Sequence, residues 1–373
     1  MIRLSKPSFS KNTEKNISKI LRSGQLIDGF FTNKFEKKIN NYFNVNNAIA
    51  VSSGTAALHL SLLSIGIKKS DEVIIPSFSY IATANVVENV GAIPVFVDIN
   101  MKNLCMDIDL LHKKITKKTK AIIIVHEFGN ICDIKKLLKI CKKNNLKIIE
   151  DAACSFGSKY NKKLSGLFGD ISCFSFHPRK VVTTSEGGIV ITKSKKDYRF
   201  IKSYKNHGVV NVLNKNKFIN PGLNYRLSEI NSVLGLDQLK SIDNKIKHRN
   251  KIAKIYEFYF KNNKNLNLTK IDDSVFCNYQ SYHITLPNET IRNKLKNYLY
   301  LNKIESNVGA QAIPFQKFYQ KKYKFKKNDF PNSYIAYTRG LVIPIGEHIS
   351  VKNAIYISKK INNFFLWAYS LNY

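Results

Sequence analysis

The sequence predicts an α/β protein built on a parallel, doubly wound sheet. Short apolar runs alternate with helical patterns between about residues 48 and 192, and a glycine-containing turn joins the first run to the first helix. Strand, helix and strand in repeated succession are typical of parallel sheets with crossover helices. The chain has 373 residues, of which 44% are hydrophobic, so it is long enough for one large domain and a smaller one.

The expected elements follow in order along the chain. Strands are expected at residues 47–51, 72–75, 94–98, 121–125, 147–150, 173–176 and 188–192. Helices are expected at residues 56–65, 81–90 and 134–144. A long helical pattern begins at Leu227, keeps its apolar residues on one side and continues through residues 249–259.

The last third of the chain mixes a strand at residues 282–286 with helices at 291–301 and 351–365. This change of pattern predicts a boundary near the long helix. We therefore expect a large domain over residues 1–245, including an N-terminal arm, and a small C-terminal domain over residues 246–373.

The formal net charge of +34 allows two interpretations. A polyanionic partner such as nucleic acid would explain it. Compositional drift would also explain it, because the excess is mostly lysine interleaved with asparagine, as at residues 142–145 and 261–264, while arginine is scarce. We favour drift and expect no nucleic-acid partner. The positive field would still attract an anionic substrate.

Neither a membrane nor a metal is expected as a partner. No apolar run reaches membrane length, and the N-terminus lacks the apolar core of a signal peptide, so we expect a cytoplasmic protein. The six cysteines include no Cys-x-x-Cys pair, and none is spaced from a histidine as in a zinc finger. They are expected to be free thiols.

Two motifs lie where an expected strand ends. Residues 51–58 pass from a strand through Gly54 into a helix beginning with Thr55. A helix N-terminus suits a phosphate, but an ordinary helix cap would have the same sequence pattern. Glu150 and Asp151 close another strand, at the edge where α/β sheets bind ligands. A carboxylate there would keep a pyridine nitrogen protonated, or it would cap a helix.

Two further motifs are polar turns. Residues 175–180 run from a strand through a proline to Lys180, and a small-residue loop follows at 183–188. Lys180 lies 29 residues after Asp151 (180 − 151), between two expected strands, so it is more constrained than a surface lysine. Asn224 and Arg226 precede the long helix, where they would cap it or reach an anion.

The order of these motifs resembles the DegT/StrS family of nucleotide-sugar aminotransferases, which are fold type I pyridoxal phosphate (PLP) enzymes. The resemblance extends over residues 2–365. Its fixed points are residues 23–24, 29, 53–59, 76–78, 82–85, 91–98, 150–153, 175–180, 186–188, 207–208 and 224–226. It implies a large domain with a mainly parallel seven-stranded sheet sandwiched by helices, and a smaller C-terminal α+β domain.

The resemblance also implies roles for single residues. Lys180 would form the Schiff base with PLP and move the proton, and Asp151 would pair with the pyridine nitrogen. The other cofactor contacts would be the phosphate ligands Gly54, Thr55 and Ser175, and the stacking ring of Tyr80. Asn224 would reach the cofactor phosphate of the neighbouring subunit, which implies a homodimer with shared active sites. Arg226, His207 and Gln311 are weaker candidates for binding the nucleotide-diphosphate sugar.

Two positions depart from the family pattern. Cys154 stands where the family often has a glutamine that contacts the ring hydroxyl of PLP. It would still approach the ring and counts among the cofactor contacts, but it is a poorer hydrogen-bond partner, so another group or a water is expected to serve that oxygen. Ser185 replaces the usual glycine of a turn and constrains it slightly. Lys180 itself argues against the dehydratases of the family, which carry histidine there.

The activity implied is transfer of an amino group, with glutamate as the donor, to a nucleotide-linked 4-keto-6-deoxy sugar. The product would be a 4-amino-4,6-dideoxy sugar for a cell-surface glycan or the O-antigen of lipopolysaccharide. Two alternatives stay open. The enzyme would instead aminate C3 of a 3-keto sugar, or the chain would be a non-enzymatic, basic nucleic-acid-binding protein of the same fold.

Overall fold

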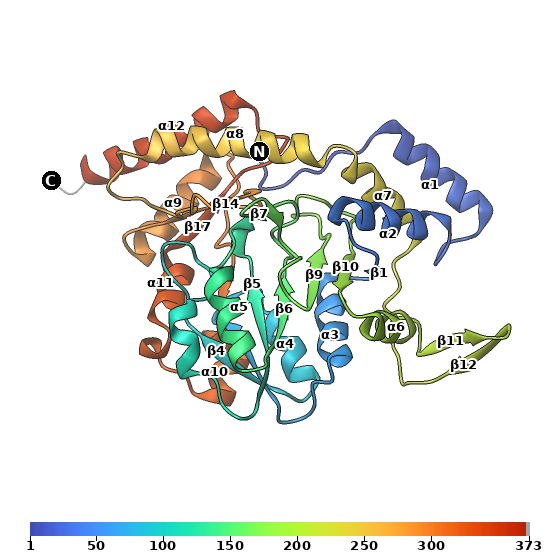
Figure 1. The fold of residues 1–373 in the computed structure, drawn as a ribbon. Coiled ribbons are helices and arrows are strands. Elements are labelled where there is room, and N and C mark those ends of the chain that lie inside the picture. The colour runs from blue at the N-terminus through green and yellow to red at the C-terminus, as the bar shows by residue number, and fades with distance from the viewer. Residues whose placement is uncertain (371–373) are drawn as a thin grey trace.

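A seven-stranded sheet lies at the centre of the computed structural model, which describes residues 1–370, with side chains to residue 366 (Figure 1). In spatial order the strands are β1 (Ala48–Val51), β10 (Gly188–Thr192), β9 (Ile171–Ser175), β6 (Lys147–Asp151), β5 (Thr119–Val125), β2 (Glu72–Pro76) and β4 (Ile93–Val97). Only β10 runs antiparallel to its neighbours in this sheet. The predicted mainly parallel, seven-stranded α/β fold is confirmed.

Alternating side chains of each strand enter different cores. On β5, Ile123 packs in the core beneath α3 (Gly54–Ser64) and α4 (Ala82–Asn89), whereas Ile122 and Ile124 pack in the core beneath α5 (Ile134–Lys143). Because side chains of a strand alternate between its two faces, a continuous apolar run requires helices on both faces. The sheet is therefore sandwiched by helices.

Side chains cap several helices at the points where strands or loops lead into them. The capping residue accepts a hydrogen bond from a backbone N–H of the first turn, which stabilises a helix start by about 1 kcal/mol. Such caps are made by Ser53 on α3, Asp133 on α5, Ser194 on α6 (Lys195–Tyr204), Ser228 on α7 (Glu229–Leu239) and Asn288 on α9 (Glu289–Leu301).

The predicted single long helix is wrong. It consists of α7 and α8 (Ile242–Phe260), and the chain leaves the helical conformation between them at Ser241, with φ −118° and ψ 13°. Leu239 before the break and Ile242 and Ile246 after it belong to one core. The apolar pattern therefore continues across the break, because both helices face the same core, and periodicity does not reveal the break.

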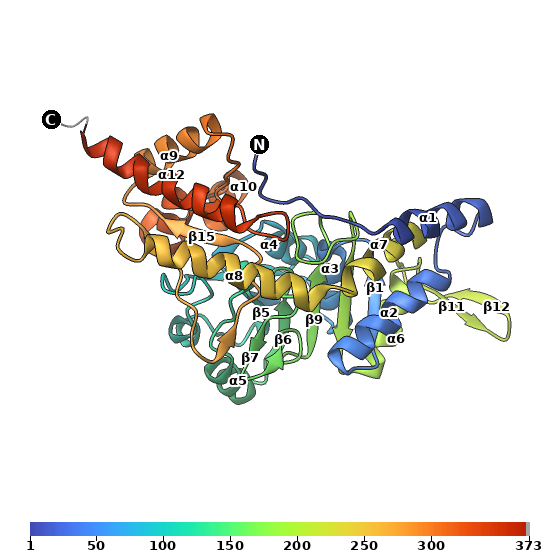
Figure 2. The ribbon, with the colours of Figure 1, turned by 90° about the horizontal axis from the view of Figure 1, so that it is seen from above.

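An N-terminal arm and a hairpin project from one end of the molecule (Figures 1 and 2). The arm contains α1 (Lys11–Ser23) and α2 (Phe30–Phe43), and the hairpin pairs β11 (Val209–Val212) with β12 (Lys215–Phe218). No helix or strand was expected in these segments from the sequence, although the buried Phe35, Ile39 and Phe43 of α2 recur at helical spacing. The hairpin is rich in lysine and asparagine and shows no such pattern.

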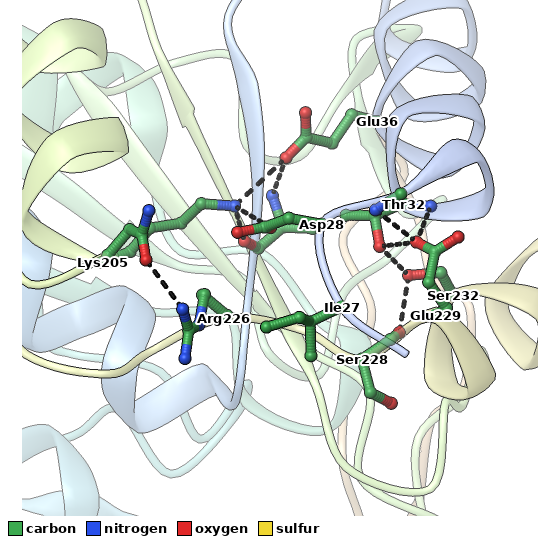
Figure 3. A network of polar contacts seen from close by, with 12 residues as sticks. Ile27, Asp28, Thr32, Glu36, Lys205, Arg226, Ser228, Glu229 and Ser232 are labelled. Atoms are coloured by element: carbon green, nitrogen blue, oxygen red, sulfur yellow. Dashed lines mark hydrogen bonds and ion pairs between the residues drawn. The ribbon is translucent and has the colours of Figure 1, made fainter. Parts of the chain in front are cut away.

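A polar network fastens this arm to α7 (Figure 3). Glu229, at the start of α7, is buried and accepts hydrogen bonds from the backbone N–H groups of Gly29, Phe31 and Thr32 at the start of α2. Beside it, the buried Lys205 donates to the Ala50 carbonyl at 3.0 Å and lies within 4 Å of carboxylates of the arm. The arm is thus held by buried charged groups as well as by packing.

The C-terminal part has its own core around a three-stranded antiparallel sheet. The strands are β13 (Asn267–Leu268), β15 (Tyr282–Thr285) and β17 (Gly340–Ile343), and α8, α9 and α12 (Val351–Ser370) pack on them. The remaining elements are β3 (Phe78–Ser79), β7 (Lys159–Tyr160), β8 (Lys163–Leu164), β14 (Val275–Phe276), β16 (Gln311–Ala312), α10 (Lys317–Tyr323), α11 (Pro331–Arg339) and the short helices η1 (Ile108–Lys113), η2 (Glu127–Gly129), η3 (Ile313–Phe315) and η4 (Lys327–Asp329).

Helix α8 spans the two cores (Figure 2). Ile246 packs with the large-domain residues, while Ile252 and Tyr256 pack in the C-terminal core. Later in the chain, Ile313 and Tyr319 return to the core of the large domain. The domain boundary after residue 245 stays a prediction. Segments beyond that boundary also pack into the core of the large domain. No helix within the described residues 1–370 is long and apolar enough to cross a membrane.

Candidate active site

The ends of three parallel strands meet the start of α3 in one place. Asp151 is the last residue of β6, and it pairs in register with Val125 of β5 and with Cys173 of β9. Ser175 ends β9, and Gly54 begins α3. Carboxyl ends of parallel strands share one edge of the sheet, which is where open α/β sheets bind ligands.

Asp151 and Glu150 face opposite sides of β6, since they are neighbours on one strand. Asp151 accepts hydrogen bonds from the Thr83 hydroxyl at 2.9 Å and from the Ala153 N–H at 3.2 Å. Burial raises the pKa of Asp151 above its ordinary value, although the Thr83 hydrogen bond and the nearby Lys180 favour the carboxylate. A cationic partner at this point would therefore be strongly favoured.

Lys180 lies in the tight connection between β9 and β10. Its N–H donates to the His177 carbonyl at 2.8 Å, and the Thr184 N–H closes the loop on the Phe176 carbonyl at 2.9 Å. The Lys180 Nζ donates to the Cys154 Sγ at 3.1 Å. Burial acts to lower the pKa of Lys180, but Cys154, Glu127 and Asp151 outweigh it and raise that pKa. Lys180, Cys154 and Asp151 thus form one electrostatic group.

The first turn of α3 lies against the end of β9. Ser53 caps the helix by accepting from the Ala56 N–H, so the N–H groups of Gly54 and Thr55 have no partner within the helix. A Cβ at Gly54 would lie 2.8 Å from the Ser175 Cβ, which is closer than two carbon atoms approach. Glycine is therefore required here, and the hydroxyls of Thr55 and Ser175 flank free helix amides in a cradle suited to a phosphate.

Tyr80 and Gln311 lie together at the next strand edge. Gln311 of β16 pairs with Ser79 of β3, the residue before Tyr80, although 232 positions (311 − 79) separate the two in sequence. Tyr80 is 65% exposed, and the Gln311 Oε1 is buried without a hydrogen-bond partner among the described residues. The chain therefore brings the segment of Tyr80 beside the strand that carries Gln311.

The remaining candidates lie apart from Lys180. His207 and Asn224 are exposed, and the Arg226 guanidinium donates to Asn224 at 3.1 Å and to Asn206 at 2.9 Å. Within the described part of the chain, no hydrogen bond or ion pair joins any of the three to Lys180 or Asp151. Their backbone does reach the site, because the Ser52 N–H donates to the Tyr225 carbonyl at 2.9 Å.

Two polar residues of the site, and a third on the other side of β6, were not assigned a role from the sequence. Thr83 fixes Asp151, Glu127 lies within electrostatic reach of Lys180, and His126 binds the buried Glu150 at 2.9 Å. Thr83 lies within residues 82–85, one of the stretches that carry the family resemblance, so the sequence contained a signal for its role. Glu127 and His126 follow the end of β5, so the rule that ligands lie at strand ends would have found them.

Ser185 occupies a left-handed backbone position, with φ 70°. This conformation favours glycine over residues with a Cβ. Ser185 therefore adopts the strained backbone conformation that was expected where serine replaces glycine in this turn.

Comparisons with known proteins agree with this geometry. The model of the DegT/DnrJ/EryC1/StrS aminotransferase family matches residues 7–362. A GDP-perosamine synthase of Escherichia coli O157:H7 is 36% identical over 96% of this chain and 97% of its own length. A UDP-4-amino-4,6-dideoxy-N-acetyl-beta-L-altrosamine transaminase of Campylobacter jejuni is 31% identical over 96% of both chains.

A solved protein of Streptococcus pneumoniae, Spr1654, has the same fold. Its apo-form is 27% identical to this chain and superposes on it with a TM-score of 0.95. The match covers 100% of this chain and 99% of the Spr1654 chain. It has also been solved in a PLP-form and a PMP-form (the latter abbreviates pyridoxamine phosphate), with TM-scores of 0.92 and 0.94.

The residues of this chain fit PLP. The cradle of α3 and Ser175 suits its phosphate, the buried Asp151 suits a protonated ring nitrogen, and the Lys180 amine suits its aldehyde. With the fold, the site and the comparisons in agreement, the chain belongs to the DegT/DnrJ/EryC1/StrS aminotransferase family and is a PLP-dependent sugar aminotransferase.

Proposed function

We propose that the enzyme moves an amino group from glutamate to a nucleotide-linked 4-keto-6-deoxy sugar and so makes a 4-amino-4,6-dideoxy sugar for a cell-surface glycan such as the O-antigen. The observation that carries the proposal is the grouping of Lys180, Asp151 and the phosphate cradle at one sheet edge. Amination at C4 is supported by the Campylobacter relative, whose name specifies a 4-amino-4,6-dideoxy sugar.

Each residue has a definite task in this proposal. PLP, when bound, supplies an electron sink for the carbon that loses its proton. Asp151, oriented by Thr83, holds a negative charge where the ring nitrogen would lie. The Lys180 amine would bind the cofactor covalently and, when released, carry the proton at its Nζ. Gly54, Thr55 and Ser175 would hold the phosphate, and Tyr80 would stack on the ring.

A second copy of the chain would complete the site. Apolar side chains stand exposed on the arm and beside the hairpin, where Phe30 is 67% and Phe218 is 73% exposed. They are joined by Leu21, Leu26, Ile27, Ile219 and Leu223, all more than 40% exposed. Exposed apolar groups in this number are typical of a protein–protein interface. A two-stranded hairpin is only marginally stable by itself, so contact with another subunit would stabilise it. We propose a homodimer in which Asn224 reaches the partner's cofactor phosphate.

The substrate side would be formed by Gln311, Arg226 and His207. Gln311 is adjacent to the exposed Tyr80, and its buried oxygen lacks a partner that a sugar hydroxyl would supply. The Arg226 guanidinium suits a diphosphate, because it is permanently charged and can donate hydrogen bonds to two oxygens at once. The high net charge of +34 would attract the same anionic substrate.

The variant Lys180→Ala tests the assignment. It is expected to lose the visible absorbance of the lysine–cofactor link and to lose turnover, whereas Lys135→Ala, which removes an exposed lysine of α5, keeps both. With ¹⁵N-glutamate and a 4-keto nucleotide sugar, NMR should find the label on C4 of the product. An unchanged cofactor link in Lys180→Ala would overturn the assignment of Lys180. Turnover of a 3-keto nucleotide sugar with label on C3, and none of the 4-keto sugar, would instead support the 3-keto alternative.

A further inference from the structure

The site contains a second buried carboxylate, which the proposed mechanism leaves without a task. Glu127 begins η2, two residues beyond the end of β5, and is only 4% exposed. The pairing of Val125 with Asp151 brings this end of β5 beside Asp151. The next residue, Phe128, has a φ of 56° and lies stacked on His283, so the backbone after Glu127 is held in a defined turn.

The surroundings of Glu127 are the groups of the active site. Its carboxylate interacts electrostatically with Lys180, Asp151 and Cys154, and the Cys105 thiol contacts its backbone. Among the described residues, the Phe128 backbone N–H interacts with this carboxylate, and no other side chain forms an ion pair with it within 4.0 Å. His126, the remaining ionisable neighbour, is engaged with Glu150 on the other side of β6. Glu127 is therefore a buried carboxylate whose interacting groups are the Phe128 N–H and the charged Lys180.

Among these groups, only Glu127 is free to exchange a proton near neutral pH. Burial, with Asp151 adding to it, raises the pKa of Glu127 to about 7 against the pull of Lys180. Burial also raises the pKa of Cys154 to about 11, so its thiol stays protonated and accepts no proton. Asp151 is committed to Thr83 and the ring nitrogen. A base is most effective when its pKa is near the working pH.

We propose that Glu127 is the proton-holding partner of Lys180. When the Lys180 ammonium must become a nucleophilic amine, the Glu127 carboxylate takes one proton and becomes a carboxylic acid. It returns that proton when the amine is protonated again, so charge and atoms balance and no other reactant is needed. Glu127 acts through Lys180 and is a positioning residue. The inference rests on the proposed role of Lys180, but it does not depend on which sugar is aminated.

The test compares Glu127→Gln with Glu127→Asp and with the control Glu289→Gln, which removes an exposed carboxylate of α9. The first readout is a pH titration of the absorbance of the lysine–cofactor link in the PLP-loaded protein. A carboxylate beside the cationic link raises its pKa, so Glu127→Gln should lower the titration midpoint by about one pH unit. The aspartate variant and the control should keep a midpoint near that of the unaltered enzyme.

The second readout is the pH profile of kcat/KM. The unaltered enzyme should gain activity as pH rises through about 7, because Glu127 must be ionised to act as a base. Glu127→Gln should lose this rise and about 10²-fold of its activity, and Glu127→Asp should retain the rise. If the midpoint and the profile of Glu127→Gln match those of the unaltered enzyme, the proposal is wrong, even when the variant binds less PLP.

The titration needs no sugar substrate. A shifted midpoint together with no amination of any 4-keto sugar would support the role of Glu127 and reject the proposed substrate. Loss of the link itself in Lys180→Ala is a separate outcome, so failure of the two proposals can be distinguished.

Discussion

Adjacent carboxylates on β6 serve different purposes because the strand turns them to opposite faces. Glu150 accepts hydrogen bonds from the N–H groups of Gly166, Phe168 and Gly169 at 2.6–2.8 Å and contacts His126. Burial opposes its ionisation, but these contacts hold the pKa of Glu150 below its ordinary value. Glu150 therefore organises the loop after β8, and Asp151 alone faces the cofactor site.

The variant Glu150→Ala should be strongly destabilised. It would leave three buried N–H groups and His126 without their acceptor, at a cost of about 3–5 kcal/mol of unfolding free energy. Urea unfolding of the purified variant measures this cost, and Glu14→Ala, at an exposed carboxylate of α1, is the control. A loss no larger than that of the control would show that the loop is held by packing instead.

At the scale of elements, Glu229 joins two helices that are far apart in sequence. It satisfies the free N–H groups at the start of α2 from the first residue of α7, and the Thr32 hydroxyl adds a further hydrogen bond at 2.5 Å (Figure 3). The positive end of the α2 dipole also favours this carboxylate. One buried side chain thus makes a large contribution to the position of the arm.

Glu229→Ala should loosen the arm. The buried N–H groups of Phe31 and Thr32 would lose their acceptor, which costs about 2–3 kcal/mol. Amide hydrogen exchange should rise in α2, while exchange in the sheet strands β5 and β6 stays slow. Equal increases in all of these elements would mean that Glu229 stabilises the whole fold rather than the arm.

At the scale of the molecule, a dimer with shared sites can be tested by mixing inactive variants. In the proposed dimer, Lys180→Ala would lack a group of its own site, and Asn224→Ala would lack a group that serves the partner's site. In a mixed dimer, both defects fall on one site and the other site is intact. After co-expression, about a quarter of the sites should therefore be active.

The matched control mixes Lys180→Ala with Asp151→Ala. Both residues lie in one chain's site, so every mixed dimer carries one defect in each site and should stay inactive. Recovery in this control, or no recovery with Asn224→Ala, would contradict the sharing of Asn224 between subunits.

The sequence predicted the sheet well and the projecting parts poorly. Strands β5, β6 and β10 were expected close to their observed ends, because fully buried strands are continuous apolar runs bounded by polar turns. An N-terminal arm was expected, but its helices α1 and α2 and the hairpin were not. Most residues of β11 and β12 are exposed, so no buried face imposes an apolar pattern on them.

The sequence by itself determined the family, the cofactor and the candidate residues Lys180 and Asp151, because covalent chemistry with PLP requires particular residue types in a particular order. Only the tertiary structure decided that Glu127 and Thr83 lie with these two residues, while Glu150 faces the other side of the strand. These groups come from the ends of different strands and helices. Their meeting depends on strand order and side-chain direction, which follow from the packing of the whole sheet.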